Sequence, residues 1–548
     1  MRGALAFSVI CWWANVFGQP VVERGSFVVD EDVLGSAPAG KDKLVIDLRG
    51  QKDELIFAAQ VGAGLRNRES AQSVYTYSND DDVFWKNELL SKETFQTKSM
   101  GDFVKEVVKQ YGVILYDSKA VDAIPAVVTV AAVRGYIPIA YSVYNDYKNA
   151  SVKVNFTHTD VNDAFSATLP FLNETSTLAI QTGARLLHGQ LVDYIVYKKM
   201  FTTYLEKGCI PFTTQRKLFK DLIKAAHWPR PIKVFGYNNQ FPVFGGDVFE
   251  AETDCANELG QIATSATTNL GYWSADAKPG LQMVQKKYEH IVYDKEKAYV
   301  AIVYGDMDNI NFVETFGKAH MLNRSKSCAE NKGACFPLTW TLSPNLLDFA
   351  PRILEWYYEK AKLSGNDWFI FPPSGTLYAY PGIFPDHIQK TYVEQMDTAA
   401  KIMNTSGSVH WEWIFTWKQA FQNYFPRYTQ GNVHTIKSFF LNNVPWVFPI
   451  VDMTIHRETY RIFGEDVVVF KPAFNWAYTN PSGGKNLTGV ECAKRIGKFS
   501  KGSINYVYTI QTTDANVLFE MAKNLPKHVQ LVSYEQLASL ALQKSKHK

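Results

Sequence analysis

The spacing of apolar residues in the first part of the chain follows two patterns, one typical of strands and one typical of amphipathic helices. KLVIDLRG (residues 43–50) and SVYTYS (73–78) are short apolar runs that predict strands. QKDELIFAAQVGAGLRNRE (51–69) and MGDFVKEVVKQYG (100–112) have the spacing of amphipathic helices. Residues 19–150 are therefore predicted to form an α/β domain.

The pattern changes over residues 151–228. Amphipathic stretches such as QRKLFKDLIKAAH (215–227) recur there and predict a mainly helical intermediate region. The proline-rich segment HWPRPIK (227–233) marks its end, because prolines interrupt helices and strands.

From residue 229 to 548 the chain repeats one unit: a short apolar run, a turn-rich segment and often a helix. Strands that alternate with helices favour a parallel sheet, and about eight such units favour a closed (β/α) barrel. An open doubly wound sheet is the alternative. The predicted fold class is thus α/β, with a C-terminal (β/α) barrel-like domain preceded by smaller α/β and helical domains. The strands come from IKVFGYN, QIATSAT, AYVAIVYGD, FPLTWTLSP, DWFIFPPSG, SVHWEWIFT, VPWVFPIVD, INYVYTIQT and VQLVSY, with EDVVVFKPAFN as a further strand that pairs locally.

The N-terminal segment MRGALAFSVICWWANVFGQP predicts a destination outside the cell. One arginine precedes an apolar run that is too short to span a bilayer, and small residues follow it near Gly18. Residues 1–18 are therefore predicted to be a cleaved signal peptide. No later run is long and clean enough to predict a membrane span, so we expect a secreted protein.

Sequons and cysteines fit an oxidising compartment. Cys328 and Cys335 bracket a short polar loop and are predicted to form a disulfide, Cys209 with Cys255 is a second candidate pair, and Cys492 is left over. Six Asn-x-Ser/Thr sequons are predicted glycosylation sites on exposed loops. Their asparagines are Asn149, Asn155, Asn173, Asn323, Asn404 and Asn486.

Charge and composition exclude several classes of function. The chain has 57 basic and 54 acidic residues, so nothing indicates a nucleic acid partner. No strand is followed by GxGxxG, so no dinucleotide cofactor is predicted, and no GxSxG indicates a serine hydrolase. The histidines are scattered, which leaves a metal site unspecified.

The carboxyl ends of the predicted barrel strands carry the candidate chemistry, because active sites in barrels lie on that face. In GDMDN, Asp306 and Asp308 are two residues apart, so in extended backbone their side chains share one side, and their mutual repulsion raises the pKa of one of them. Such a pair provides a proton donor beside an ionised carboxylate. With Asn309 it could instead bind Ca²⁺ or Mg²⁺, or the three residues could cap a turn and the next helix.

HWEW is the second candidate. In an extended strand Trp411 and Trp413 share one face and Glu412 takes the other, where nearby aromatic rings would raise its pKa for general acid catalysis. The alternative is a core strand with packed tryptophans. Asp452 and Asp514 are single acids at strand ends and are predicted to be structural.

PPSGTLYAYPG (372–382) resembles the signature of the GxGYxYP family of putative glycoside hydrolases, and YGDMDN resembles that family's Ser-Asp-Gly-Asp-Asn element. The order and spacing agree from Tyr304 to Pro381, and VFGYN and TTNLGYWS extend the resemblance. Leu377 stands where the family has the second glycine. If that position needs a positive φ, leucine would strain it. The matching positions are Asp306, Asp308, Asn309, Gly375, Tyr378, Tyr380 and Pro381.

The resemblance implies a carbohydrate substrate. The predicted catalytic residues are Asp306, Asp308 and Glu412. The predicted substrate-binding residues are Asn309, Tyr378, Tyr380, Trp411 and Trp413, since aromatic rings stack on sugars and tyrosine hydroxyls bond them. The alternatives are a non-catalytic carbohydrate-binding glycoprotein, which the change at Leu377 favours, and a metal-dependent hydrolase.

The predicted signal peptide and glycosylation sites can be tested together. We expect the mature protein to begin near Gln19 and to carry N-glycans on several sequons. Enzymatic deglycosylation of protein secreted from eukaryotic cells should lower its mass. Secreted protein whose mass does not change would contradict the prediction.

Overall fold

A computed structural model describes most of the chain after the N-terminal segment. The predicted signal peptide, Cys255, Asn486, Trp413, Asp452 and Asp514 lie outside the described residues. The structure describes residues 23–24, 27–28, 42–69, 72–180, 191–236, 257–262, 264, 267–276, 283–330, 333, 335–412, 416–442, 459–476, 487–510, 513 and 515–546.

Strands and helices alternate along the chain as the pattern predicts. The strands are β1 Glu23–Arg24, β2 Phe27–Val28, β3 Asp42–Asp47, β4 Gln72–Tyr77, β5 Gln96–Lys98, β6 Val113–Tyr116, β7 Ile137–Ala140, β8 Val152–Asn155, β9 Leu178–Ile180, β10 Phe201–Thr203, β11 Ile232–Gly236, β12 Leu259–Ile262, β13 Ala298–Tyr304, β14 Leu338–Thr341, β15 Asp367–Ile370, β16 Gly407–His410, β17 Ser438–Leu441, β18 Tyr460–Phe463, β19 Val467–Phe470, β20 Pro472–Asn475, β21 Ile504–Thr509 and β22 Val529–Leu531.

Helices of several kinds connect them. The α-helices are α3 Asp53–Glu69, α4 Asp80–Leu89, α5 Met100–Tyr111, α6 Ile124–Arg134, α7 Val161–Thr168, α8 Val192–Lys198, α9 Thr214–Ala225, α11 Leu270–Ala275, α12 Ile310–Phe312, α13 Lys318–Glu330, α14 Leu346–Phe349, α15 Pro351–Ser364, α16 Asp386–Ile402, α17 Trp417–Gln419, α18 Gly489–Ile496, α19 Ala515–Lys523 and α20 Tyr534–Lys546. The 3₁₀ helices are η1 Val121–Ala123, η2 Tyr144–Tyr147, η3 Leu169–Glu174, η8 Pro381–Ile383 and η10 Phe425–Thr429, and the π-helices are η6 Val313–Gly317 and η9 Ala420–Tyr424.

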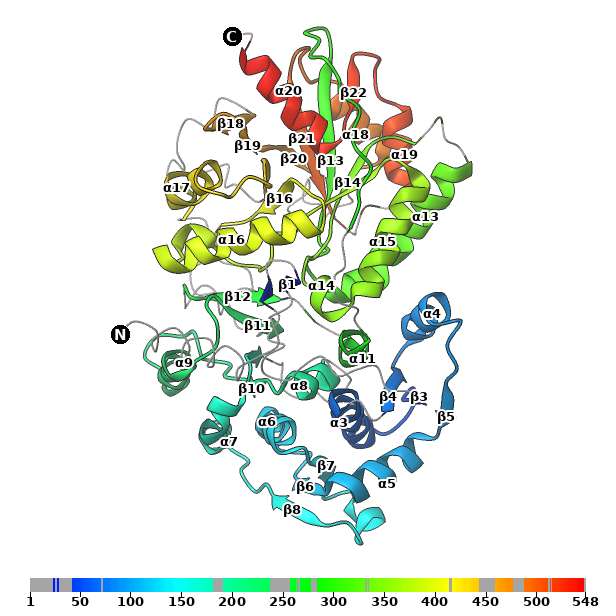
Figure 1. Cartoon of the computed structure of the whole chain (residues 1–548), viewed down its shortest axis with the longest axis vertical. Coiled ribbons are helices and arrows are strands. Elements are labelled where there is room, and N and C mark those ends of the chain that lie inside the picture. Colours follow the sequence, from blue (N-terminus) through cyan, green and yellow to red (C-terminus); the bar gives the residue numbers. More distant parts are fainter. Residues whose placement is uncertain are drawn as a thin grey trace, which may run out of the picture.

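Three small parallel sheets make up most of the N-terminal half, which occupies the lower part of Figure 1 in blue to green, and β1 and β2 form a separate antiparallel pair. Their strand orders are β4-β3-β5, β7-β6-β8 and β10-β9-β11-β12. The α/β prediction is confirmed. Residues 151–228, predicted as mainly helical, also contain β8, β9 and β10. β11 and β12, predicted for the barrel, instead pair with β9 and with each other, so the first barrel strand is β13.

The C-terminal half is compatible with the predicted barrel. Parallel pairing runs from β20 through β21, β13 and β14 to β15. A parallel bridge between Phe371 and Ser408 continues it to β16, and β16 pairs with β17 and β17 with β19. Only Lys471 separates β19 from β20, so the pairings return to their start and trace an irregular ring.

Alternation along these strands separates an inner from an outer face. Tyr299, Ala301 and Val303 of β13 belong to one buried cluster with alternate residues of β15, β16, β17, β19 and β21. Their neighbours Val300 and Ile302 belong to a second cluster, which includes the surrounding helices. Residues of α20 join the inner cluster, so this last helix packs against the barrel interior. Because side chains fill its interior, the ring is a packed core and not a pore.

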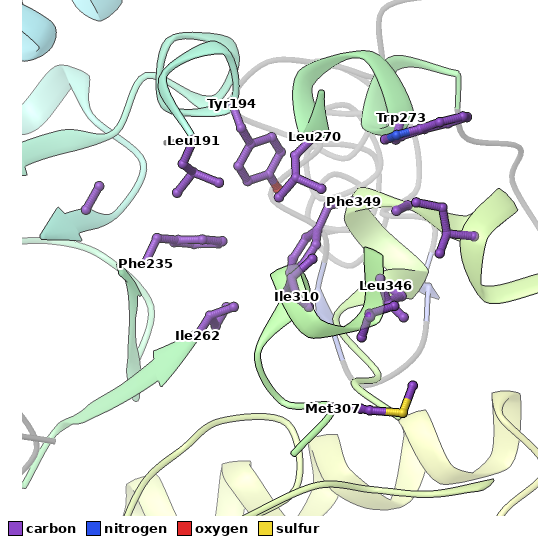
Figure 2. Packing of buried hydrophobic residues seen from close by; sticks show 14 of the residues in the cluster. Leu191, Tyr194, Phe235, Ile262, Leu270, Trp273, Met307, Ile310, Leu346 and Phe349 are labelled. Atoms are coloured by element: carbon purple, nitrogen blue, oxygen red, sulfur yellow. The ribbon is translucent and has the colours of Figure 1, made fainter. Parts of the chain in front are cut away.

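A second apolar region joins the two halves, and Figure 2 shows it from close by. Tyr194 of α8 and Phe235 of β11 face Phe349 of α14 there, and Met307 and Ile310 reach the same cluster from the loop after β13. The loop that carries the predicted catalytic aspartates is therefore anchored in the contact between the N-terminal half and the barrel.

The disulfide between Cys328 and Cys335 is confirmed. Beside it, Arg324 and Asp367 form a fully buried ion pair, in which Asp367 also accepts a hydrogen bond from the Trp340 indole at 2.8 Å. Cys209 is also disulfide-bonded, to a partner outside the described residues, and Cys492 is a free buried thiol.

Two further observations are consistent with the predicted glycosylation and with the expected lack of a membrane span, but they do not test either. The side chains of the sequon asparagines that the structure describes are exposed; they are Asn149, Asn155, Asn173, Asn323 and Asn404. Within the described part of the chain, no helix is both long and apolar enough to cross a membrane.

Three buried carboxyl groups gather where the two halves meet. Asp82 accepts hydrogen bonds from Thr268 Oγ1 at 2.6 Å and Asn269 Nδ2 at 2.9 Å, and Asp193 accepts one from the Gly271 N–H at 2.8 Å. Burial is the main cause that raises the pKa of Asp82 and of Asp193 to about 6, and burial also raises the pKa of Glu314 well above its usual value. Lys318, four residues after Glu314, pairs with Asp81.

These carboxyls predict a stability that falls as the pH rises. The pKa of Asp193 is about 6 in the folded protein against 3.8 for the ordinary side chain, so the folded state binds more protons between these values. The stability that each such group contributes is therefore fully present below pH about 4 and is lost as the pH rises through about 6, by about 1–3 kcal/mol. Urea unfolding at three pH values from 4.5 to 6.5 measures the slope, which Asp193→Asn should reduce. Asp122→Asn, at an exposed position, is the control, and equal slopes in both variants would contradict the assignment.

Candidate active site

The acidic loop begins at the carboxyl end of β13. Asp306 has a positive φ of 75°, which is uncommon outside glycine. Met307 is 1% exposed and packs in the core, whereas Asp306 and Asp308 on either side of it keep partial exposure. Desolvation by the surrounding protein and the negative charge of Asp306 raise the pKa of Asp308 to about 8. At neutral pH, Asp308 is therefore mainly a neutral acid beside an ionised carboxylate.

Gly305, immediately before the pair, has no room for a side chain. A Cβ atom there would lie 1.8 Å from the hydroxyl oxygen of Tyr508 on the neighbouring strand β21. The Tyr508 ring belongs to the inner cluster of the barrel. Glycine at position 305 thus lets the Tyr508 hydroxyl approach the backbone directly before Asp306. The sequence analysis missed Tyr508, although the alternation in INYVYT places it on the same strand face as Tyr506.

Asn309 has a structural task in addition to its predicted one. Its side chain accepts a hydrogen bond from the Asn311 N–H at 3.1 Å and caps α12. The π-helix η6 follows at once, and such turns often occur near functional sites. This capping agrees with the turn-forming alternative for Asn309.

The motif loop Pro372–Pro381 leaves the carboxyl end of β15. The positive φ that this loop needs lies at Gly375, where φ is 107° and a Cβ would lie 2.2 Å from the Met396 thioether. Leu377 is not among the residues with positive φ, so leucine at this position is not strained. Its side chain is 3% exposed and packs on Gly260 of β12, where any Cβ would collide with it.

Hydrogen bonds connect the acidic loop and the motif loop at the rim of the barrel through residues that lie between them. The Met307 N–H donates to Thr341 Oγ1 at 3.3 Å, and Asn345 Nδ2 donates to the Thr376 carbonyl at 2.7 Å. Thr341 ends β14 and Asn345 stands directly before α14, so β14 and the loop after it connect the acidic loop to the motif loop.

Ser374 connects the motif loop to the next strand. Its hydroxyl accepts from the Trp411 N–H at 2.8 Å and lies within donating distance of the Trp411 and Ala379 carbonyls, at 2.7 and 2.9 Å. The side chain is fully buried. Ser374 is therefore a bridge between two loops, and its Oγ is not presented to a substrate.

Two predicted substrate-binding aromatics come together. The rings of Tyr378 and Trp411 are nearly parallel, at 22°, with centroids 6.0 Å apart, and both side chains keep partial exposure. Tyr378 is further fixed by reciprocal backbone hydrogen bonds with Gln261 of β12, at 2.8 and 2.9 Å. Tyr380, by contrast, is only 2% exposed. The pair offers an aromatic surface at the rim, while Tyr380 braces the loop.

Glu412 is fully buried. Its Oε1 accepts from the Gly382 N–H at 2.6 Å and contacts His410 Nε2 at 3.0 Å, and its Oε2 accepts from the Thr416 hydroxyl at 2.6 Å. Both oxygens are therefore engaged in holding the end of the motif loop. This bonding favours the structural alternative for Glu412 over the proton-transfer role predicted from HWEW.

Two amides that follow strands were assigned no role by the sequence analysis. Asn345 Oδ1 and Asn442 Oδ1 are buried and have no hydrogen-bond partner among the described residues. Asn442 follows β17 and, by alternation from Phe440 of the inner cluster, faces the barrel interior. Buried polar atoms usually have partners, so these acceptors are suited to hydroxyl donors of a ligand. The signal that could have found Asn442 is the run SFFLN, whose strand was not predicted.

No group of three or more His, Cys, Asp or Glu side chains within the described ranges has the arrangement of a metal site. The acidic loop thus offers two carboxylates and the Asn309 amide, of which the amide oxygen is already used as a cap.

Sequence comparison identifies the C-terminal part of the chain. Residues 296–541 match the family described as "GxGYxYP putative glycoside hydrolase C-terminal domain". The resemblance predicted from the motif loop and the acidic loop is thereby confirmed over this region. No curated protein sequence matches the chain significantly.

Structural comparison supports the fold over nearly the whole chain. The crystal structure of a putative hydrolase from Bacteroides thetaiotaomicron superposes with a TM-score of 0.73 at 18% identity, covering 93% of this chain and 96% of that one. At this identity the likeness shows a shared fold alone. A 4-alpha-glucanotransferase from Thermococcus litoralis superposes with a TM-score of only 0.28 at 9% identity, covering 44% of this chain and 40% of that one, which is too low to show a shared fold.

The bonding of Glu412 leads to a test that needs no substrate. Glu412→Gln keeps the shape but replaces one acceptor oxygen by an amide NH₂ group, so a buried donor loses its partner. The free energy of unfolding should fall by about 1–3 kcal/mol. Glu394→Gln, an exposed position on α16, is the matched control. Thermal and urea unfolding measure both variants, and a Glu412→Gln variant as stable as the wild type would refute the structural role.

Proposed function

We propose that this protein is a secreted glycoside hydrolase in which Asp308 is the proton donor and Asp306 its ionised partner. The single observation that carries the proposal is this pair: two carboxyl groups at a barrel rim, with the pKa of Asp308 raised to about 8. The family match over residues 296–541 supports a hydrolase role.

The pair suits glycosidic bond cleavage because that reaction needs one neutral and one ionised carboxyl group. The neutral acid protonates the leaving oxygen, and the carboxylate stabilises or attacks the positive sugar centre or activates a water. An ordinary aspartate is ionised at neutral pH and cannot donate a proton. Burial and the charge of Asp306 keep Asp308 protonated, so the two side chains divide these roles by environment.

The aromatic pair supplies the binding surface of the proposed site. Tyr378 and Trp411 present neighbouring, partly exposed rings at the ends of β15 and β16. The rings have an apolar face for the C–H side of a sugar, and the orphan oxygens of Asn345 and Asn442 are acceptors for sugar hydroxyls. Stacking and acceptor groups together favour a carbohydrate over a purely apolar ligand.

A non-catalytic carbohydrate-binding protein is the second candidate. The observation that favours it is the engagement of both Glu412 oxygens, which leaves the acidic loop to supply both carboxyl groups. The change to leucine at position 377 does not favour this candidate. The positive φ of the motif loop lies at Gly375, so Leu377 is not strained.

Turnover of a glycan found by screening a polysaccharide panel tests the proposal. Asp306→Asn and Asp308→Asn should each lower kcat by about 10²–10⁴-fold, the usual contribution of acid–base catalysis, with little change in melting temperature. Because Asp308 acts in its protonated form, wild-type activity is present below pH about 8 and is lost as the pH rises through the pKa of about 8. The Asp308→Asn variant should lack this alkaline limb.

Matched measurements separate the alternatives. Asp122→Asn, at an exposed position of η1, should keep full activity. Melting curves with and without chelator detect a metal, which would stabilise the wild type and not the variants. Binding that survives in Asp308→Asn while the wild type shows no turnover of any glycan would favour the non-catalytic candidate. Full activity in both loop variants would remove the pair from the mechanism.

A further inference from the structure

We infer that the cavity between the N-terminal half and the barrel is a second binding site, which takes a small aromatic ring bearing a carboxylate. This inference does not depend on the proposed function. The cavity has a volume of about 270 Å³. An apolar cavity of ~150 Å³ takes up benzene, so this one has room for a fused ring system with a polar substituent.

Aromatic side chains line the cavity from both halves of the protein. Tyr194 of α8, Phe235 of β11 and Phe349 of α14 surround one another, with ring centroids 5.7, 5.7 and 5.9 Å apart. Figure 2 shows the three rings directed toward a common region. Ring pairs at such separations adopt edge and tilted geometries, so a planar aromatic guest finds both ring faces and ring edges to pack against.

The charged residues of the wall set the preferred charge of the guest. Lys198, Arg230 and Lys233 line the cavity, and Asp348 is the one carboxylate among the described lining residues. Arg230 is held by Glu258 and by carbonyl groups, so its position is fixed. Glu258 compensates the charge of Arg230. The two partly exposed lysines then outnumber Asp348 in the wall, which favours an anionic substituent.

Leu377 relates this cavity to the motif loop. The residue stands where the family signature has glycine, and its side chain forms part of the cavity wall together with Thr376. The loop continues directly to Tyr378, which stacks on Trp411. The departure from the signature therefore adds apolar surface to this cavity without straining the backbone, and a guest would contact the loop that presents Tyr378.

Isothermal titration of the full mature protein with 2-naphthoate, and with the neutral 2-naphthalenemethanol, tests the inference. Naphthoate should bind at least tenfold more tightly than the alcohol. Leu377→Trp, which fills the cavity, should weaken naphthoate binding at least tenfold, and Lys233→Met should weaken the binding of naphthoate but not of the alcohol.

Two exposed positions of α15 provide controls of the same chemistry, and Leu363→Trp and Lys362→Met should leave the affinity unchanged. Circular dichroism melting verifies that Leu377→Trp folds. If it does not, Phe349→Leu, which removes one ring, replaces it with the same expectation. No binding of naphthoate, equal affinity in the cavity variants and the wild type, or a crystal structure of the complex with naphthoate bound elsewhere would overturn the inference. Because no turnover is measured, these results do not depend on whether the protein is a glycosidase.

Discussion

The arrangement of the barrel rim depends on how the loop between Pro372 and Pro381 is held. The loop leaves β15 and must cross to the ends of β14 and β16 and to β12 of the N-terminal half. The Ser374 hydroxyl, the Asn345 amide and the Glu412 carboxylate each tie one part of it, and the backbone of Tyr378 pairs with Gln261. A buried loop needs partners for its polar groups. This need accounts for the dense turn chemistry of the sequence, and it leaves the partly exposed Tyr378 as the side chain that the loop presents.

The apolar pattern predicted the strands that surround the acidic loop, because AYVAIVY, DWFIF and INYVYT are long, strongly apolar runs between turns. It could not assign strands to sheets. β11 and β12 have the same pattern as barrel strands, yet they pair with β9, since pairing depends on contacts far apart in the sequence. β17 was missed because SFFL is short, and β19–β20 was predicted to pair locally although it completes the ring.

The candidate site was predictable where chemistry follows from neighbours in the sequence. Asp306 and Asp308 were expected to influence each other, and the raised pKa of Asp308 fits that expectation. Residues whose role depends on distant contacts were not predictable. Glu412 looked like an acid between aromatics, but its partner Gly382 lies thirty residues away, at the end of the motif loop. Leu377 looked like a strained substitution, but the neighbouring Gly375 takes the unusual backbone angle.

Burial raises the pKa of carboxyl groups in two parts of this protein, and solvent access distinguishes them. Asp82 and Asp193 are closed off in the contact between the halves. The segment Thr268–Gly271 donates hydrogen bonds to both, and the Ser78 and Asn79 N–H groups also donate to Asp82. Whether such a closed-off carboxyl group is neutral or charged affects only the stability of the fold. Asp308 keeps partial exposure at the ends of the barrel strands, beside a second carboxylate. A perturbed pKa indicates chemistry only where a substrate can reach the group, and by this criterion the acidic loop, and not the larger buried cluster, is the place to look for catalysis.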